Sequence, residues 1–251
     1  MNPVWPSVII NLKQHIVGEQ VKEYILRIAN TAKKYNQKVA LCPPIADVDK
    51  AFFAVKHNDE SLFDHVWIFA PKVDDVAIGE SKTGAVAVES VMHTQGVMIN
   101  HFETRIYGQS EPHKSGAQFQ TLCNIIKKCT AKNLKMVLCA DNHVTAEKIA
   151  RYVSELEMDP ENVVIAIEWD AFIGKRISIV KEKPDEIERA VQAVKKVNPH
   201  IRVYCGAGIE TKEDLIKAKK LGASGFLAAT AFTKAPLFGG DYIMALESFW
   251  K

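Results

Sequence analysis

Polar side chains that could carry out acid–base chemistry follow apolar runs at several points of the chain. Residues 163–167 form one such run and lead directly into Glu168, while Asn11, Lys13 and His101 follow two other runs. A carboxylate can remove a proton beside a carbonyl, and an imidazole can polarise that carbonyl. A lysine at such a place is costly unless it meets an anion. These residue types therefore favour proton transfer on an anionic carbonyl compound.

Each of these side chains also has a structural interpretation. Glu168 would then mark only the point where a strand meets water, Lys13 would extend to solvent, and His101 would be a hydrogen-bonded rim residue. Asn11 and Lys13 are two residues apart, and alternate residues of a strand point to the same face. The functional interpretation is favoured because all four residues would lie at one end of the same fold.

Two turns rich in small residues come later in the chain. The segments C-G-A-G-I at 205–209 and A-A-T-A at 228–231 each end an apolar run. Small residues expose backbone N–H groups, and turns after the last two strands of a barrel commonly bind phosphate. The alternative is that the first turn is only a tight loop. Together with Lys13, these turns predict a phosphate site.

Eight apolar runs predict buried parallel strands, because they are rich in β-branched residues and apolar on both faces. They lie at residues 7–13, 38–42, 65–70, 96–100, 135–139, 163–167, 201–205 and 224–229. Helical patterns alternate with them and include residues 21–35, 116–132, 145–156, 184–197 and 212–222. Eight such strand–helix units predict a (β/α)8 barrel spanning residues 1–251 as a single domain, with a doubly wound open sheet as the alternative.

Local signals fix the ends of some helices. Thr211 with Asp214 predicts an N-cap with an acidic third position, and Pro184 predicts a helix start. Gly222 predicts the end of the helix at 212–222.

The composition excludes several classes of function. The chain has 251 residues and a net charge of +2 from 32 basic and 30 acidic residues, with no basic run, so no nucleic-acid partner is expected. No apolar run is long enough for a membrane span, and the first residues lack the layout of a signal peptide. The five cysteines are scattered without a C-x-x-C pair. We expect a cytoplasmic, reduced protein without a metal site.

The motifs together resemble the triosephosphate isomerase family, and its shorter archaeal form in particular, over nearly the whole chain. The segments that carry the resemblance are N-L-K at 11–13, T-G at 83–84, N-H-F-E-T-R at 100–105, A-I-E…I-G at 166–174, C-G-A-G-I at 205–209 and G-F-L-A-A-T-A-F-T-K-A at 225–235.

The resemblance implies an aldose–ketose isomerase of glycolysis and gluconeogenesis that interconverts dihydroxyacetone phosphate and D-glyceraldehyde 3-phosphate through an enediolate, without a cofactor. It implies that Glu168 is the base, that His101 is a neutral electrophile, and that Asn11 and Lys13 hold the substrate and stabilise the enediolate. The residues whose backbone N–H groups it assigns to the phosphate are Gly174, Gly206, Ala207, Gly208, Thr230 and Ala231.

The segment after Glu168, which is a lid in this family, departs from the family pattern. Trp169 stands where the family has proline, and Lys175 and Arg176 replace two small residues of I-G-T-G. If the replaced glycine takes a positive φ, Arg176 is strained there. The two cations either add attraction for phosphate or extend into solvent, and we expect the latter for Arg176.

Neighbours of the site also depart from the family. The serine after the catalytic histidine is Phe102, and the A-Q-[NH] pattern is Ala70-Pro71-Lys72. By resemblance, Glu103 and Arg105 would be supporting ion-pair partners. These changes favour a slow isomerase or a shifted substrate.

Two other functions stay open on the sequence: an isomerase of a different phosphorylated sugar, and a barrel that binds a phosphometabolite without turnover. The family forms dimers and its archaeal members often tetramers, so a homodimer or homotetramer is implied. Thr83-Gly84 would then lie in an intersubunit loop. Residues 242–250 would cover either the flank of the barrel or an interface.

Overall fold

The computed structural model describes residues 5–108, 116–234 and 241–251. The last residue of the motif at 225–235 lies outside these ranges.

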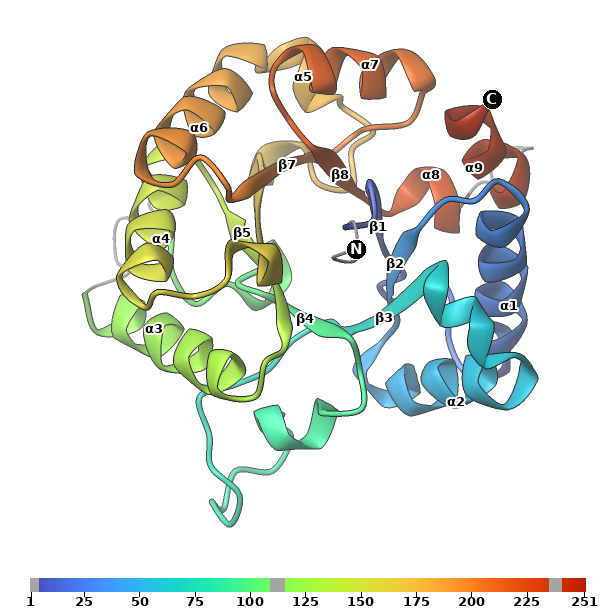
Figure 1. The fold of residues 1–251 in the computed structure, drawn as a ribbon, viewed down its shortest axis with the longest axis horizontal. Coiled ribbons are helices and arrows are strands. Elements are labelled where there is room, and N and C mark those ends of the chain that lie inside the picture. The colour runs from blue at the N-terminus through green and yellow to red at the C-terminus, as the bar shows by residue number, and fades with distance from the viewer. Residues whose placement is uncertain (1–4, 109–115, 235–240) are drawn as a thin grey trace.

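Parallel strands close into a barrel in chain order, from β1 to β8 and back to β1 (Figure 1). The strands are β1 (Val8–Asn11), β2 (Val39–Cys42), β3 (Val66–Ala70), β4 (Gly96–Ile99), β5 (Lys135–Ala140), β6 (Val163–Glu168), β7 (Arg202–Gly206) and β8 (Gly225–Ala228). The predicted (β/α)8 barrel is confirmed, and the open sheet is excluded because β1 pairs with β8.

Helices surround the barrel (Figure 1). They are α1 (Glu19–Lys34), α2 (Val48–Asn58), α3 (Gly116–Ala131), α4 (His143–Glu155), α5 (Ile179–Glu182), α6 (Pro184–Val197), α7 (Lys212–Lys220), α8 (Thr230–Thr233) and α9 (Tyr242–Trp250). The expectation of a helix after every strand is wrong in one unit. The connection between β3 and β4, residues 71–95, contains only the 3₁₀ helix η3 (Val88–Val91) and extends away from the barrel.

The predicted helix ends are confirmed. Thr211 and Asp214 form a capping box at the start of α7, and Pro184 occupies the first turn of α6. Gly222 lies just beyond α7 with φ 92°, a conformation that glycine adopts without a steric penalty.

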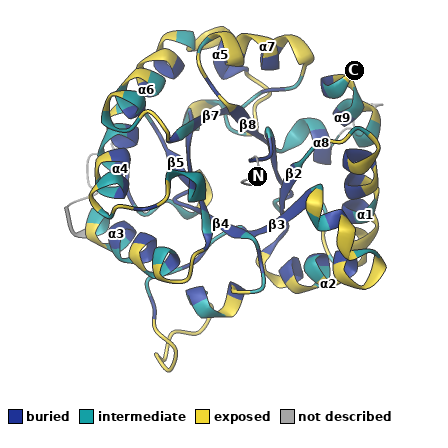
Figure 2. Ribbon diagram, in the orientation of Figure 1, coloured by how far each residue is buried: buried dark blue, intermediate teal, exposed yellow. Residues whose placement is uncertain are grey.

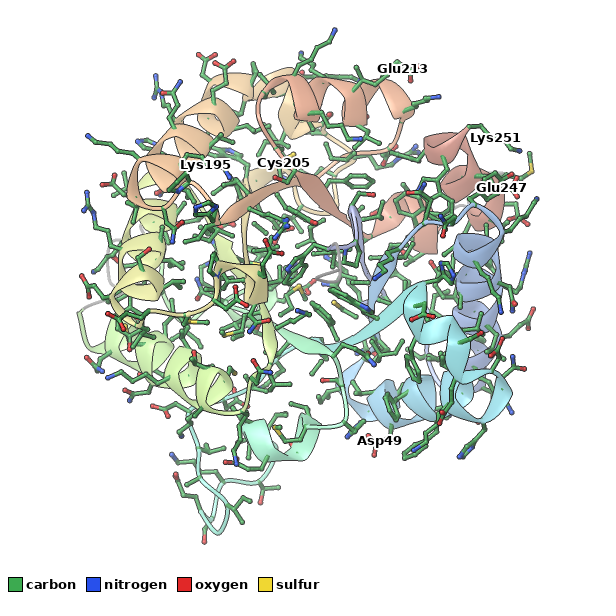
Figure 3. All side chains as sticks on the ribbon, in the orientation of Figure 1. Asp49, Lys195, Cys205, Glu213, Glu247 and Lys251 are labelled. Atoms are coloured by element: carbon green, nitrogen blue, oxygen red, sulfur yellow. The ribbon has the colours of Figure 1, made fainter. Side chains whose placement is uncertain are left out.

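The strands are buried on both faces, as Figure 2 shows in dark blue. Side chains such as Val8 and Ile10 pack outward against the helices, whereas Ile9 points inward. The inner residues form a separate cluster of Trp5, Ile9, Ala40, Cys42, Trp67, Phe69, Met98, Val137, Cys139, Val164, Ala166, Tyr204 and Leu227. Side chains therefore fill the barrel rather than line a pore (Figure 3).

The alternation of side chains brings polar groups to the barrel mouth. Ile9 points inward from β1, so Asn11 two residues later does too. Val164 and Ala166 point inward from β6, and Glu168 continues their row at the carboxyl end of the strand. Both residues are buried, with 4% of Asn11 and 3% of Glu168 exposed when backbone and side chain are taken together.

Aromatic residues close the opposite end of the barrel. The Trp5 ring lies edge-on to Trp67 and Phe69, with ring centroids 5.6 and 5.8 Å away. The Trp5 indole N–H donates to the Glu161 carbonyl at 2.7 Å, and the Tyr204 hydroxyl donates to the Pro6 carbonyl. These contacts hold Trp5 and Pro6, which precede β1, against this end of the barrel.

The C-terminal helix α9 covers the flank of the barrel. Leu246 and Phe249 are buried, and the Phe249 ring stacks at 5.3 Å on Phe226 and lies 5.3 Å from Phe232. Residues 242–250 were expected to cover either the flank of the barrel or an interface, and the structure supports the flank. Within the part of the chain that the structure describes, no helix has the length and apolar character that a membrane crossing requires.

We expect Tyr204→Phe to lower the free energy of unfolding by about 1–3 kcal/mol, because the Pro6 carbonyl would lose its buried donor. Urea titration followed by circular dichroism measures this change. An unchanged free energy of unfolding would show that the hydrogen bond contributes nothing to stability.

Candidate active site

A narrow cavity opens at the carboxyl ends of the strands, with a volume of about 40 Å³. Nearly all residues predicted for the site line it: Asn11, Lys13, His101, Glu168, Gly174, Ala207, Gly208, Thr230 and Ala231. Gly206 lies just behind them on β7, where an added Cβ would lie 3.4 Å from Glu168 Oε1 and 2.7 Å from the Leu227 carbonyl oxygen. The structure thus brings residues from five strand ends, those of β1, β4, β6, β7 and β8, to one place.

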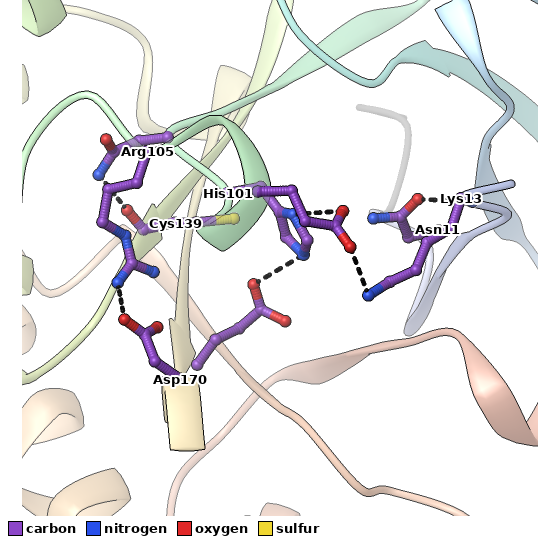
Figure 4. A network of polar contacts seen from close by, with 9 residues as sticks. Asn11, Lys13, His101, Arg105, Cys139 and Asp170 are labelled. Carbon is purple, nitrogen blue, oxygen red and sulfur yellow. Dashed lines mark hydrogen bonds and ion pairs between the residues drawn. The ribbon is translucent and has the colours of Figure 1, made fainter. Parts of the chain in front are cut away.

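Glu168 and His101 face each other within this cavity (Figure 4). His101 Nε2 lies 3.3 Å from Glu168 Oε2, and both side chains are only 4% exposed. The imidazole Nδ1 on the other side lies 3.3 Å from Glu103 Oε2. His101 therefore stands between two carboxylates, one buried and one half-exposed.

Opposing effects act on the pKa of His101. Burial alone would lower this pKa, but the Glu168 carboxylate and the hydrogen bond to Glu103 outweigh burial and raise it. In turn, hydrogen bonds from His101 and Lys13 hold the pKa of Glu103 at about 2. Glu103 therefore stays ionised, and its contact with Nδ1 stabilises the protonated form of His101.

Lys13 reaches the site through a turn rather than through the pleat of β1. The strand ends at Asn11, and Lys13 adopts a left-handed conformation with φ 50°. Its backbone N–H donates to Asn11 Oδ1 at 3.0 Å, and its ammonium Nζ lies 2.9 Å from Glu103 Oε1. Lys13 lies at the cavity, as its spacing from Asn11 predicted. A hydrogen-bonded turn places it there, rather than the alternation of side chains along a strand.

Asn100 holds the loop that carries His101, a role that the sequence did not reveal. It has φ 65°, and its buried amide nitrogen donates to the carbonyls of Tyr107 and Cys139 at 2.7 and 2.9 Å. Its oxygen accepts from the backbone N–H groups of Ile106 and Tyr107, each at 2.8 Å. The available signal was an asparagine at a strand end, a residue type that tolerates this backbone conformation.

Cys139 is a second site neighbour that sequence reasoning missed. It lies inside the barrel on β5, near Glu168, and it follows Val137 by two residues in the inward-pointing row. Burial, and then the Glu168 carboxylate, raise the pKa of this thiol well above its ordinary value. It therefore stays a neutral thiol against which the carboxylate packs.

The far end of the cavity is built from the small-residue turns. Gly174 and Gly208 both have φ 75°, and an added Cβ at Gly208 would lie 2.0 Å from the Ile177 carbonyl oxygen. The first amides of α8, at Thr230 and Ala231, have no acceptor within that helix. Backbone N–H groups and the absence of bulky side chains suit an anionic group here.

The β6–α5 loop, residues 169–178, lies along this cavity and is tied at its start. Arg105, whose side chain is 3% exposed, forms an ion pair with Asp170. The ammonium of Lys183 lies 4.9 Å from the centre of the Trp169 ring. The predicted supporting roles of Glu103 and Arg105 in ion pairs are confirmed, and Phe102 extends outward with 43% exposure.

The end of the same loop corrects one expectation. Arg176 does not extend into solvent but binds Glu210 of the turn after β7, with Nη2 2.7 Å from Oε2. Its φ is 58°, as the glycine that it replaces suggested. A left-handed backbone costs a non-glycine residue about 1–2 kcal/mol, so the surrounding contacts must hold it there.

The described residues contain no cluster of three or more histidine, cysteine or acidic side chains that could hold a metal ion. The side chains that line the site supply a carboxylate, an imidazole, an amide and an ammonium group, beside turns that can accept an anion.

Comparisons with known proteins show the family to which the chain is related. A family model described as triosephosphate isomerase matches residues 6–240. The triosephosphate isomerase of Methanothermus fervidus is 27% identical over 229 residues, which cover 90% of each chain. That of Saccharolobus solfataricus is 30% identical over 234 residues, which cover 92% of this chain and 90% of the relative.

A solved structure supports the fold independently. The triosephosphate isomerase of Bartonella henselae superposes with a TM-score of 0.67 over 99% of this chain and 100% of that chain, at 13% identity. At this identity the likeness shows the barrel fold alone, whereas the family model covers most of the sequence. The chain belongs to the triosephosphate isomerase family.

Proposed function

We propose that this protein is a triosephosphate isomerase that interconverts dihydroxyacetone phosphate and D-glyceraldehyde 3-phosphate. The observation that carries the proposal is the 3.3 Å approach of Glu168 and His101 in a cavity whose far end consists of small-residue turns. This reaction needs a base for a carbon-bound proton, a group that serves the two oxygens, and an anion site for the phosphate. The matched family carries the name of this reaction.

In the proposed mechanism, Glu168 removes a proton from the hydroxymethyl carbon of dihydroxyacetone phosphate and returns it to the neighbouring carbon. The carboxylate suits this role because it projects inward from the end of β6 and is 4% exposed, so little water competes for the proton. Gly206 leaves room beside it, since a side chain there would approach Oε1.

His101, Lys13 and Asn11 stabilise the enediolate that forms between the two transfers. A neutral imidazole can donate to one substrate oxygen and accept a proton from the other. The Lys13 ammonium, held by Glu103 at 2.9 Å, supplies positive charge beside the developing negative charge. Asn11 fixes the turn of Lys13 by accepting its backbone N–H.

The phosphate binds at the turns that contain Gly174, Ala207, Gly208, Thr230 and Ala231, which line the far end of the cavity. Closure of a loop over the substrate excludes water, and the lid of triosephosphate isomerase is itself a standard example of such closure. The β6–α5 loop is the lid in this proposal.

We also propose that the protein forms a homodimer or a homotetramer in the cytoplasm. The β3–β4 connection extends from the barrel, and its Ile78 is 77% exposed. A second pocket of about 450 Å³ lies beside the site and is lined by Lys13, Pro44 and Glu103 among others. Insertion of this connection into the pocket of a second copy would bury both Ile78 and the pocket. All five cysteines are free and buried, which agrees with a reducing compartment.

Replacing Glu168 by Gln keeps the size of the side chain and removes the base. We expect kcat for glyceraldehyde 3-phosphate to fall by about 10²–10⁴-fold with little change in KM, because general bases typically contribute this much. Glu168→Asp keeps the charge but withdraws it from the substrate, and its kcat should fall about 100-fold. A coupled assay of purified protein measures both variants.

An unchanged kcat in both variants would remove Glu168 from the role of base. A wild-type protein that binds 2-phosphoglycolate but does not turn over the triose phosphates would instead favour a different phosphorylated sugar or a non-catalytic binding protein.

The pH dependence of kcat/KM reports the protonation of His101 in the free protein. Its pKa is raised, so activity should fall as the pH decreases through a value above the ordinary histidine pKa of about 6.5. Glu103→Gln removes a group that raises this pKa, so the acid limb should move to lower pH. An acid limb that stays in place, measured alongside the His101 resonance by NMR, would contradict the proposed role of Glu103.

Assembly is tested by light scattering after size-exclusion chromatography. We expect the mass of two or four chains for the wild type and dissociation for Ile78→Asp, because a buried unpaired charge opposes the interface. Met244→Asp is the matched control, since Met244 is 70% exposed on α9 at the flank of the barrel. A wild-type protein with the mass of one chain would contradict the proposed assembly.

A further inference from the structure

Two residues that lie after neighbouring strands join the lid to the turn after β7. Arg176 Nε lies 3.0 Å from both Oε1 and Oε2 of Glu210, and Arg176 Nη2 lies 2.7 Å from Oε2. The guanidinium therefore uses two nitrogens on one carboxylate, the geometry in which such pairs are strongest. Both residues line the cavity in which the phosphate site is proposed.

The segment that follows Arg176 is fixed to the same turn by its backbone. Ile179 N donates to the Ala207 carbonyl at 3.1 Å, and the Ile177 carbonyl packs directly on Gly208. Ser178 donates to the buried carboxylate of Asp214 at 3.2 Å. Arg176 thus stands at the boundary between an anchored segment and the part of the loop that lines the cavity, residues 172–174.

The backbone of Arg176 indicates what the pair does. Its φ of 58° is unfavourable for any residue with a Cβ, whereas Gly174 adopts φ 75° at no such cost. A strained conformation persists where surrounding contacts hold it. The two-nitrogen contact with Glu210 is such a contact, and it holds the chain reversal that places Gly174 over the cavity.

We propose that the ion pair between Arg176 and Glu210 is a clasp that holds the lid over the bound phosphate, with Arg176 as a positioning residue. The kinetic consequence rests on the proposed isomerase function, because the clasp would set the rate of lid opening and therefore of ligand release. The competing possibility is that Arg176 binds the phosphate itself. The geometry argues against it, since Nε and Nη2 of Arg176 are both directed at the Glu210 carboxylate.

The experiment compares Arg176→Gln, Glu210→Gln and the double variant with the wild type. Stopped-flow displacement gives the rate of 2-phosphoglycolate release, and the coupled assay gives kcat and KM. Each single variant should release 2-phosphoglycolate up to about fivefold faster, the range of a partly exposed ion pair, and raise KM. The double variant should be no faster than either single variant, because both lose the same interaction.

Further variants separate the clasp from a general loss of stability. Exchanging the two residues, as Arg176→Glu with Glu210→Arg, should restore part of the slow release. Arg151→Gln is the matched control, because it removes an exposed pair with Glu147 on the outer helix α4 and should leave release unchanged. Added salt should reduce the difference in the rate of 2-phosphoglycolate release between the wild type and the single variants, since it screens the ion pair.

The outcomes distinguish the two proposals. Slower release in Glu210→Gln, with faster release in Arg176→Gln, would show that Arg176 binds the phosphate and would overturn the clasp. Wild-type release rates in both single variants would overturn it as well. A wild type without turnover would contradict the isomerase function. The release rates of 2-phosphoglycolate from wild type and variants would still test the clasp in that case. A wild type that neither turns over nor binds 2-phosphoglycolate would contradict both.

Discussion

The structure depends on keeping a carboxylate buried at the end of an apolar strand, opposite an imidazole. Glu168 is 4% exposed and lies 3.3 Å from His101 Nε2, and taking such a group out of water is costly without a partner. The barrel provides that partner, because parallel strands that close on themselves bring all their carboxyl ends to one mouth. His101 is held in turn by Glu103, and Glu103 by Lys13. A single row of polar contacts thus connects the proposed base Glu168 to Lys13, the residue expected to face the enediolate.

The departures from the family pattern do not leave the lid loose. Arg105 pairs with Asp170 at the start of the lid, and Arg176 binds Glu210 at its end. In a loop with small hinge residues, the backbone is free to adopt several conformations. Here charged side chains on neighbouring loops hold it, and under the proposed clasp added salt would act on substrate access.

Periodicity in the sequence predicted most of the fold, because buried parallel strands are continuous apolar runs and longer helices such as α1, α4 and α6 bury one apolar face. It failed at residues 71–95, where the connection lacks an α-helix. The side chains at the strand ends could be named because Glu168 and His101 have no packing reason to follow apolar runs. Lys13, in contrast, reaches its place through a left-handed turn, and Glu210 meets Arg176 across 34 residues. Neither fact has a local sequence signal, because each depends on how separate loops approach one another.

The central claim is that a buried carboxylate moves a proton between adjacent carbons. Conversion of dihydroxyacetone phosphate in D₂O, with the product examined by NMR, tests it most directly. A base whose proton exchanges with solvent must place deuterium at C2 of part of the glyceraldehyde 3-phosphate. Deuterium at this carbon is the predicted result. Product that carries only protium at C2, with no deuterium at C1 of the dihydroxyacetone phosphate that remains, would show that the transferred hydrogen never reaches an exchangeable group and would contradict the account.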